Sequence, residues 1–231
     1  MEETLPKHVA IIMDGNRRWA KKQGKFALLG HEAGIESLRS IRNFILEKGI
    51  KYFTVWTFST ENWKRDQKEV RGLLKLFEKY LSDEKEISEL EEKGVSLRII
   101  GDLSKFSKSI QELSKKVMTR LEKSKKLIFT IAMSYGGRDE LRRMVKKVVG
   151  KNISPDEVTE EIVNDNLDTG FLPDPELIIR TGGRRRLSGL MPWQSGYSEL
   201  YFTDTLWPDF GPKDFQKALD WFSKQKRNFG K

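Results

Sequence analysis

Arginine is concentrated in one short segment, in which four arginines stand within seven positions: Arg180, Arg184, Arg185 and Arg186. Two glycines come directly before the last three. Like charges at this spacing repel one another, so the arrangement indicates an anionic partner outside the segment. Because the guanidinium group presents paired N–H donors to phosphate oxygens, a phosphate group is the partner that this pattern favours.

A second basic segment, MDGNRRWAKKQGK, follows the first apolar run. Asp14 leaves that run, Gly15 and Asn16 tolerate a tight turn, and Arg17 and Arg18 begin a helical pattern. Backbone N–H groups at a helix start, together with arginine, can bind phosphate, and an acid beside them is where Mg²⁺ bridges phosphate oxygens. The alternative is an ordinary Asp-Gly turn before a basic, solvated helix. No G-K-[ST] follows, so the segment is not a P-loop.

Two further loops carry polar residues. FSTENWKR contains Ser59, Asn62 and Arg65 beside Trp63, and it either closes over a ligand or only connects two elements. SYGGRDEL has a glycine pair that allows close approach of the backbone, but it fits equally well a strand-to-helix turn capped by Asp139.

Histidine and cysteine content excludes several kinds of site. The chain has no cysteine, which excludes disulfides, thiolate metal sites and cysteine nucleophiles. With only two histidines, a Ser-His-Asp triad or a His-rich zinc site is not expected. His8 opens the first apolar run and is interpreted as structural. His31, in GHEAG, either donates to an anion or lies at the surface.

The elements that must position these residues alternate between strands and helices. The strand candidates are apolar on both faces, as buried parallel strands are. They are residues 8–13, 51–58, 95–100, 127–134 and 176–180, with 199–202 as a sixth, shorter candidate. Helical periodicity separates them, with apolar faces that include Ile35, Leu38, Ile41 and Ile45; Val70, Leu73, Leu74, Phe77, Tyr80 and Leu81; and Leu141, Met144, Val145 and Val148.

This alternation predicts a single α/β domain over residues 1–231, built on a mostly parallel six-stranded sheet surrounded by helices. In such sheets, ligands bind beyond the carboxyl ends of the strands. Each basic or polar loop described above follows a strand, so we expect them to meet at one edge of the sheet. Because two of the loops are rich in arginine, we expect two polyanionic ligands or one large one.

The net charge and the hydrophobic content limit the classes of protein to which the chain can belong. The 231 residues carry a net charge of +9, and 37% of them are hydrophobic, enough for a substantial core. The excess charge suits nucleic acid, an anionic membrane face or a phosphorylated small molecule. A nucleic-acid-binding protein would expose aromatic residues beside its basic stripe, and the arginines here cluster at strand ends instead. No apolar run has the length of a membrane span and no signal-peptide pattern is seen, so a cytoplasmic location is expected.

Six blocks in order closely resemble the cis-prenyltransferase family: HVAIIMDGNRRWAKKQG, GHEAG, FSTENWKR, YGGRDEL, IIRTGG…RLSG…WQ and ELYFTDTLWPDF, followed by RNFG at 227–230. The resemblance implies a homodimer and an apolar tunnel beside the sheet. It also implies a reaction in which an allylic prenyl diphosphate loses its diphosphate. The double bond of isopentenyl diphosphate attacks its C1 carbon, and loss of a proton leaves a new cis double bond.

The resemblance also implies roles for individual residues. Asp14 and Asn62 would be catalytic, and Asp14 would hold Mg²⁺ with the help of Glu199. The allylic diphosphate would be bound by Gly15, Asn16, Arg17, Arg18, Trp19 and His31. A mobile loop would close through Ser59, Asn62, Trp63 and Arg65. Isopentenyl diphosphate would be bound by Arg180, Arg186 and Ser188. Candidates for the tunnel wall are Leu73, Leu74, Phe77 and Leu81 with Val55, Ile99 and Ile131, although residues of this kind are more often plain core.

The chain departs from the family pattern at two positions. Ala27 stands where the family has an arginine four residues before the histidine of GH, and Arg184 replaces an acid. These departures favour an alternative: an atypical member with a short product or a different acceptor. A non-catalytic partner subunit is a further alternative, against which the intact Asp14, Asn16 and Arg18 argue. The lipid product leaves room for a loose membrane association.

Overall fold

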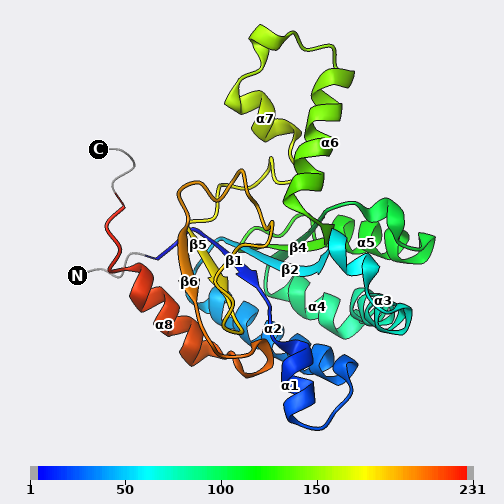
Figure 1. Cartoon of the computed structure of the whole chain (residues 1–231), viewed down its shortest axis with the longest axis vertical. Helices are drawn as coiled ribbons and strands as arrows, with labels where there is room; N and C mark the ends of the chain where they lie inside the picture. Colours follow the sequence, from blue (N-terminus) through cyan, green and yellow to red (C-terminus); the bar gives the residue numbers. More distant parts are fainter. Residues whose placement is uncertain (1–4, 228–231) are drawn as a thin grey trace.

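Residues 5–227, which the computed structural model describes, form a sheet of six parallel strands in the order β3-β4-β2-β1-β5-β6 (Figure 1). The strands are β1 (His8–Ile12), β2 (Tyr52–Ser59), β3 (Val95–Ile100), β4 (Leu127–Tyr135), β5 (Leu177–Arg180) and β6 (Glu199–Phe202). All five residues of β1 are buried, as expected for the centre of a sheet covered on both faces.

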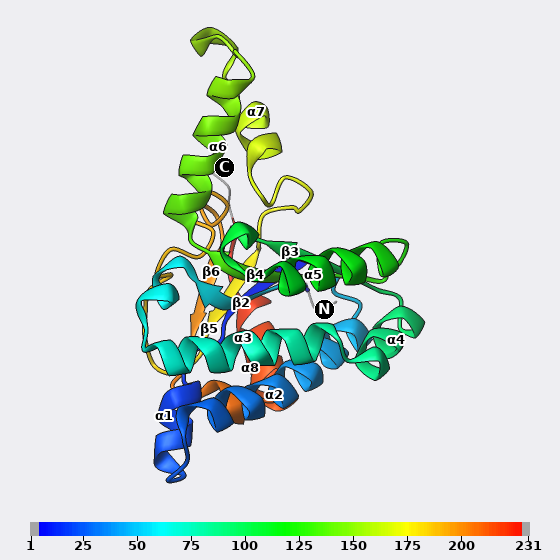
Figure 2. The same ribbon diagram turned by 90° about the vertical axis from the view of Figure 1, so that its right-hand side faces the viewer.

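Helices cover the two faces unequally. Figure 2 shows α2, α3 and α8 on one side of the sheet, and α6 and α7 rising from the other. The helices are α1 (Asn16–Lys22), α2 (Ala27–Glu47), α3 (Gln67–Leu81), α4 (Glu84–Glu92), α5 (Lys108–Arg120), α6 (Gly137–Gly150), α7 (Glu160–Asn166) and α8 (Pro212–Phe222). Single 3₁₀ turns occupy Thr60–Lys64, Leu103–Lys105, Pro155–Glu157 and Trp207–Asp209. The largest apolar core lies between the sheet and the helices α2, α3, α5 and α8.

Helix α3 illustrates how the local sequence determines where a helix begins and which face it buries. The Asp66 carboxylate accepts hydrogen bonds from the backbone N–H groups of Lys68 and Glu69, so it caps the helix. Val70, Leu73, Leu76 and Leu81 recur at helical spacing and are all buried. The helix therefore begins at a capping acid and turns one apolar stripe toward the sheet.

Helices α6 and α7 pack against each other through a small core of their own, which contains Met144, Val148, Val163 and Leu167. The Arg143 guanidinium donates to Asp168, with Nη1 2.6 Å from Oδ1, and this joins α6 to the segment after α7. The pair projects from the body of the molecule (Figure 1).

The predicted fold class is confirmed, with every strand pair parallel. His8 is structural, as predicted: its ring contacts Thr54 Oγ1 at 2.8 Å and the Pro173 carbonyl at 2.6 Å, and burial lowers its pKa to about 4. The predicted capping role of Asp139 is wrong. Gly136 is the N-cap of α6, and Asp139 lies in the first turn, where it pairs with Arg142 and Arg143. Most of the RNFG block, 228–230, lies outside the described residues.

Candidate active site

Asp14 lies at the carboxyl end of β1 between two arginines from different segments. Its Oδ2 accepts a hydrogen bond from Arg180 Nη2 and its Oδ1 accepts one from Arg18 Nη2, both at 3.0 Å. β1 and β5 are neighbours in register, with Ile12 beside Arg180, and this register brings the two basic segments together. The prediction that these loops meet at one sheet edge is confirmed.

The segment after β5 surrounds the Arg180 side chain. Arg180 Nη1 donates to Ser188 Oγ at 2.7 Å and to the Arg186 carbonyl, and Arg186 Nε also lies 3.3 Å from Ser188 Oγ. Arg180 is buried, and its Nε has no partner among residues 5–227. Arg184 and Arg185 are exposed on the same turn.

The turn depends on glycine at position 182. Gly182 has φ +78°, and a Cβ there would lie 2.5 Å from Arg18 Nη2 and 2.8 Å from the Asp14 carbonyl oxygen. A side chain would therefore be strained and would displace the arginine that holds Asp14.

His31 and Asn16 form a second polar pair beside the acid. Asn16 Nδ2 lies 3.3 Å from His31 Nδ1. Burial lowers the pKa of His31 to about 4, with further lowering by the charges of Arg65 and Arg17. The ring is therefore neutral at pH 7. If Nδ1 accepts from the Asn16 amide, Nε2 carries the proton.

His31 Nε2 is buried and has no hydrogen-bond partner in the described part of the chain, and the same is true of Asn16 Oδ1. A buried donor without a partner is costly, so an acceptor at this position would be bound favourably. Arg17, Arg18 and Arg65 line the same pocket as His31, so the acceptor that fits is an anion.

The segment after β2 forms one wall of the site. Ser59 N donates to Asn62 Oδ1 at 3.0 Å, and Trp63 Nε1 donates to Ser134 Oγ at 2.9 Å. Arg65 Nη1 pairs with Glu69 at 3.0 Å, on the first turn of α3. These contacts hold the loop against the sheet while Ser59, Asn62 and Arg65 line the cleft.

A polar cleft of about 940 Å³, counted with its open mouth, joins these groups. Asp14, Asn16, His31, Asn62, Arg65, Arg180 and Ser188 line it. A neighbouring polar pocket of about 660 Å³ is lined by Asp14, Gly15, Asn16, Arg17, Arg18, His31 and Arg65. The two polar pockets adjoin and share one acid, Asp14.

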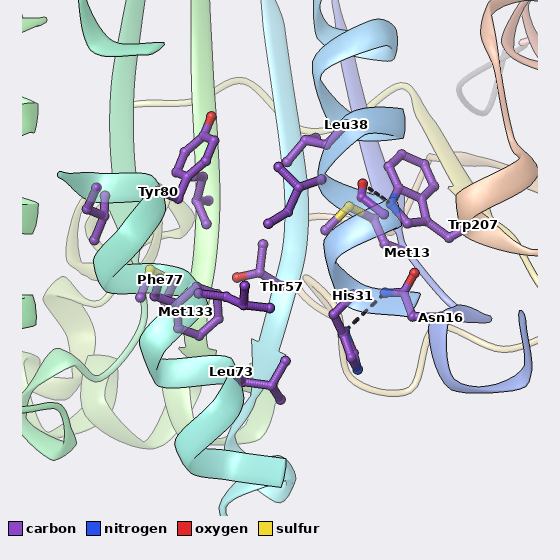
Figure 3. Close-up of a pocket in the computed structure, with 15 residues that line it drawn as sticks. Met13, Asn16, His31, Leu38, Thr57, Leu73, Phe77, Tyr80, Met133 and Trp207 are labelled. Atoms are coloured by element: carbon purple, nitrogen blue, oxygen red, sulfur yellow. Dashed lines mark hydrogen bonds between the residues drawn. The ribbon is translucent and has the colours of Figure 1, made fainter. Parts of the chain in front are cut away.

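An apolar pocket of about 680 Å³ continues from the cleft between α2, α3 and the sheet (Figure 3). Met13, Asn16, His31 and Thr57 line both spaces. Leu73, Phe77, Leu81 and Ile131 line the pocket as predicted. Leu74, Val55 and Ile99 do not line it and pack in or against the main core, which corrects that part of the prediction.

Tyr80 closes the far end of the apolar pocket (Figure 3). It also lines a second pocket, whose other walls are mainly charged. Ile35 and Leu76 line both pockets as well, so these three side chains together separate the two spaces. Its hydroxyl lies 3.3 Å from Arg42 Nη1 and 3.4 Å from Glu86 Oε1, and Arg42 and Glu86 form an ion pair with each other. Arg42 is 1% exposed and Glu86 4%, so this ion pair lies in the interior.

Four predicted site residues line neither polar pocket: Trp19, Trp63, Arg186 and Glu199. Trp63 packs against the main core, and Arg186 contacts Ser188, which lines the cleft. Trp19 Nε1 donates to Asp209 Oδ1 at 2.6 Å, and Trp19 lines neither polar pocket. Glu199 begins β6 beside Leu177, three residues before the register position of Arg180, or about 10 Å along the strand. One chain therefore does not bring Glu199 to Asp14.

Sequence reasoning missed three residues that line or support the site. Thr57 lines both the cleft and the apolar pocket, Glu69 pairs with Arg65, and Tyr80 ends the pocket. Tyr80 lay on the predicted apolar face of its helix. Only the packing of α3 against α2 decides whether a residue on that face lines the pocket or packs in the core. A tyrosine among leucines was the available signal, because a buried hydroxyl needs a partner.

Comparisons with known proteins agree with the geometry of the site. A family model described as "Putative undecaprenyl diphosphate synthase" matches residues 12–230. An isoprenyl transferase of Aquifex pyrophilus is 43% identical over 231 residues, covering 100% of this chain and 98% of that protein. The ditrans,polycis-undecaprenyl-diphosphate synthase of Escherichia coli strain K12 is also 43% identical, over 100% and 93% of the two chains.

Two solved structures share the fold. Lavandulyl diphosphate synthase from Lavandula x intermedia, in complex with dimethylallyl diphosphate, aligns with a TM-score of 0.93 and 33% identity over 98% of this chain and 99% of that one. "A probable undecaprenyl diphosphate synthase" from Campylobacter jejuni aligns with a TM-score of 0.82 and 32% identity, over 99% and 100%. The chain therefore belongs to the undecaprenyl diphosphate synthase family of prenyltransferases.

Proposed function

We propose that the protein condenses an allylic prenyl diphosphate with isopentenyl diphosphate to form a cis-prenyl diphosphate. One observation carries the proposal: Asp14, bound between Arg18 and Arg180, lies in a polar cleft that continues into an apolar pocket. A ligand with a charged head and a hydrocarbon tail fits such a pair of spaces. The enzymatic names of the relatives support the same reaction class.

In this reaction the allylic C1–O bond breaks and diphosphate leaves. The double bond of isopentenyl diphosphate supplies the electrons of the new bond to C1, and a proton lost from the resulting cation restores a double bond. The leaving diphosphate gains charge, so N–H donors that point at it stabilise the transition state most. We assign that role to Arg17, Arg18 and Arg65 with His31 Nε2, which line the pocket on one side of Asp14.

Isopentenyl diphosphate is assigned to the other side of Asp14. Arg180, Arg186 and Ser188 are already joined by hydrogen bonds there. Asn62 lines the cleft between the two groups, in reach of both reacting ends. Two diphosphates in adjoining pockets repel each other, and these arginines reduce the repulsion.

Mg²⁺ fits this site as a cofactor that takes most of its ligands from the substrate. Among residues 5–227 no group of three His, Cys, Asp or Glu side chains could hold a metal. Magnesium commonly uses one or two carboxylates with phosphate oxygens and water, and Asp14 supplies one carboxylate. When bound, the ion would neutralise charge on the leaving diphosphate. Glu199 is too far from Asp14 to complete this site within one chain.

A homodimer is part of the proposal. β6 is an edge strand of the described sheet, and Leu200 on it is exposed, as are Val145 and Val149 on the projecting α6. Exposed apolar side chains beside an open strand edge are typical of association surfaces. Sedimentation equilibrium of the wild type and of Val149→Asp tests this: a dimer weakened by the substitution is expected, and a monomeric wild type would contradict it.

No helix within residues 5–227 has the length and apolar character needed to cross a bilayer. We propose that the enzyme works in the cytoplasm, where both charged substrates are available to an open cleft.

The decisive experiment incubates purified protein with radiolabelled isopentenyl diphosphate, Mg²⁺ and allylic primers of increasing length, and sizes the products. A ladder of long cis products is expected, and chelation of Mg²⁺ should abolish it. A single short product, or turnover only with another acceptor, would support the atypical reaction suggested by Ala27 and Arg184. Turnover only in the presence of an active homologue would identify a partner subunit and contradict the proposal.

A further inference from the structure

The connection between α1 and α2 carries an exposed apolar cluster. We call residues 21–29 the α1–α2 tip. Phe26 is 86% exposed, the largest exposed fraction among the large hydrophobic side chains described, and Leu29 and Leu28 are 42% and 36% exposed. Exposed clusters of this kind mark interaction surfaces more often than single exposed leucines do.

The same tip carries three lysines. Lys21, Lys22 and Lys25 are exposed, and no acidic residue occurs from Gly15 to Gly30. Arg17 and Arg18 of the same stretch line the anion pockets, but the three lysines line neither pocket. Their charge is therefore unexplained by the substrate cleft.

The tip is fixed to the body of the protein. Lys25 N donates to the Ala20 carbonyl at 2.9 Å, and Leu29 N donates to the Phe26 carbonyl at 3.0 Å. Gly30 lies so close to α1 that a Cβ there would be 2.1 Å from the Asn16 carbonyl oxygen. The apolar side chains are therefore held outward by a rigid corner between two helices.

Only part of the cluster packs against its own chain. Leu28 approaches α3, where its Cδ1 would lie 3.1 Å from a Cβ at Gly72. Phe26 and Leu29 remain as two exposed apolar side chains in a segment that also carries three exposed lysines. Aromatic and aliphatic side chains bordered by lysine are the composition of surfaces that dock on lipid headgroups.

We propose that the α1–α2 tip docks on an anionic lipid bilayer. Phe26 and Leu29 enter the boundary between headgroups and acyl chains, and Lys21, Lys22 and Lys25 lie against lipid phosphates. Charge complementarity selects this occupant, because a second copy of the tip would bring like charges together. Of the surface proposed for the homodimer, α6 projects from the other end of the molecule, and β6 forms an edge of the central sheet (Figure 1).

Docking in this way sets the orientation of the enzyme. Arg17 and Arg18 lie on α1, which leads directly into the tip, so docking would bring the allylic pocket close to the lipid surface. An amphiphile with a diphosphate head would be presented to the pocket from that surface. The docking surface itself does not depend on the proposed reaction, because its composition and exposure are independent of the cleft.

Co-sedimentation with vesicles tests the proposal. The full chain is mixed with vesicles of phosphatidylcholine alone or of phosphatidylcholine with phosphatidylglycerol, without substrates. Binding is expected only to the mixed vesicles and should weaken as salt rises. The triple variant Lys21→Glu, Lys22→Glu, Lys25→Glu should bind at least about tenfold more weakly.

A matched control is available in another exposed lysine group, Lys123, Lys125 and Lys126. Changing these three lysines to glutamate alters the net charge equally and should leave most of the binding intact. An equal loss in both triple variants would overturn the proposal in favour of diffuse charge attraction.

The apolar contribution is tested by Phe26→Ser with Leu29→Ser, and by Phe171→Ser as the control, because Phe171 is an exposed apolar side chain outside both the tip and the proposed dimer surface. The double variant should lose vesicle binding by about fivefold or more at constant charge, and the control should not. Unchanged binding of the double variant, or no binding by the wild type, would overturn the proposal. So would self-association of the wild type that the tip substitutions abolish, because it would make the tip a protein interface. Circular dichroism confirms that each variant is folded.

Discussion

Asp14 Oδ2 and Arg180 Nη2 lie 3.0 Å apart, although 166 positions separate the two residues in the chain. The pair joins the ends of two neighbouring parallel strands, and Arg18 completes it from the other side. The two arginines orient this carboxylate in the polar cleft. The arrangement places one negative group where two diphosphates would meet.

Replacing this acid should remove activity without unfolding the protein. Asp14→Asn keeps the shape of the side chain but removes the charge that would bind Mg²⁺. We expect kcat to fall by about 100-fold or more. Asp209→Asn, which changes the acceptor of the Trp19 N–H group outside the cleft, is the control and should retain most activity. Equal losses in the two variants would contradict the role of Asp14.

The arginines after β5 should differ in their contributions. Arg186 contacts Ser188 beside Arg180, whereas the adjacent Arg185 is exposed and makes no hydrogen bond or ion pair with residues 5–227. Arg186→Met should raise the KM for isopentenyl diphosphate by about tenfold or more, because a charge-assisted hydrogen bond is lost. Arg185→Met removes the same charge and should change this KM little. Steady-state kinetics with each substrate varied in turn separates the two outcomes.

Tyr80 should limit the length of the product. Its ring, together with Ile35 and Leu76, divides the apolar pocket from the charged pocket behind it, so Tyr80→Ala would remove part of this wall and lengthen the space open to the chain. We expect the product distribution of Tyr80→Ala to move to longer chains. Tyr80→Phe keeps the ring and should keep the wild-type distribution. Chromatography of radiolabelled products is the measurement, and an unchanged distribution in Tyr80→Ala would show that the chain does not reach this wall.

The ion pair behind Tyr80 should matter for stability. Arg42→Met leaves Glu86 buried and without its nearest cation, although Arg39 Nε still donates to Glu86 at 2.8 Å. We expect the free energy of unfolding to fall by about 2–3 kcal/mol, somewhat less than for a buried charge with no partner left. The double variant Arg42→Met, Glu86→Met should recover much of this loss. Denaturant unfolding of the three proteins measures it, and no recovery would mean that the cost comes from packing.

Stability should decrease in mild acid because of two histidines. Burial lowers the pKa of both His8 and His31 to about 4 in the folded protein, against 6.5 in the unfolded chain. Between these values the unfolded chain binds more protons, so stability is complete above pH 6.5 and is lost as pH falls toward 4. From pH 7 to pH 5 each histidine should contribute a loss of about 2 kcal/mol.

Unfolding of the wild type and of His31→Gln at the two pH values tests this expectation. The variant keeps a polar side chain that does not titrate. Between pH 7 and pH 5 its free energy of unfolding should therefore fall less than that of the wild type, by about the contribution of one histidine. Equal pH dependence of the two proteins would show that His31 is not buried in its neutral form.

Much of the site could be predicted from local sequence, since strand and helix periods and the residues at strand ends are local properties. The strands appeared within one or two residues of their observed bounds, and Asp14, Arg18 and Arg180 were expected at one edge because parallel strands end together. The tunnel residues were predicted less well. Leu73 and Leu74 share an apolar helix face, but only Leu73 lines the pocket.

The sequence by itself therefore determined the strand–helix order and the chemical character of each loop, because both follow from side chains within a few residues of one another. The tertiary structure decided which residues from distant segments meet. The register of β5 on β1 places Arg180 at Asp14. The parallel register of β6 on β5 leaves Glu199 at the end of β6 that is farther from the cleft. The packing of α3 against α2 places Tyr80 in the wall of the apolar pocket. Strand register and helix rotation depend on how the whole core packs, and no short stretch of sequence contains that information.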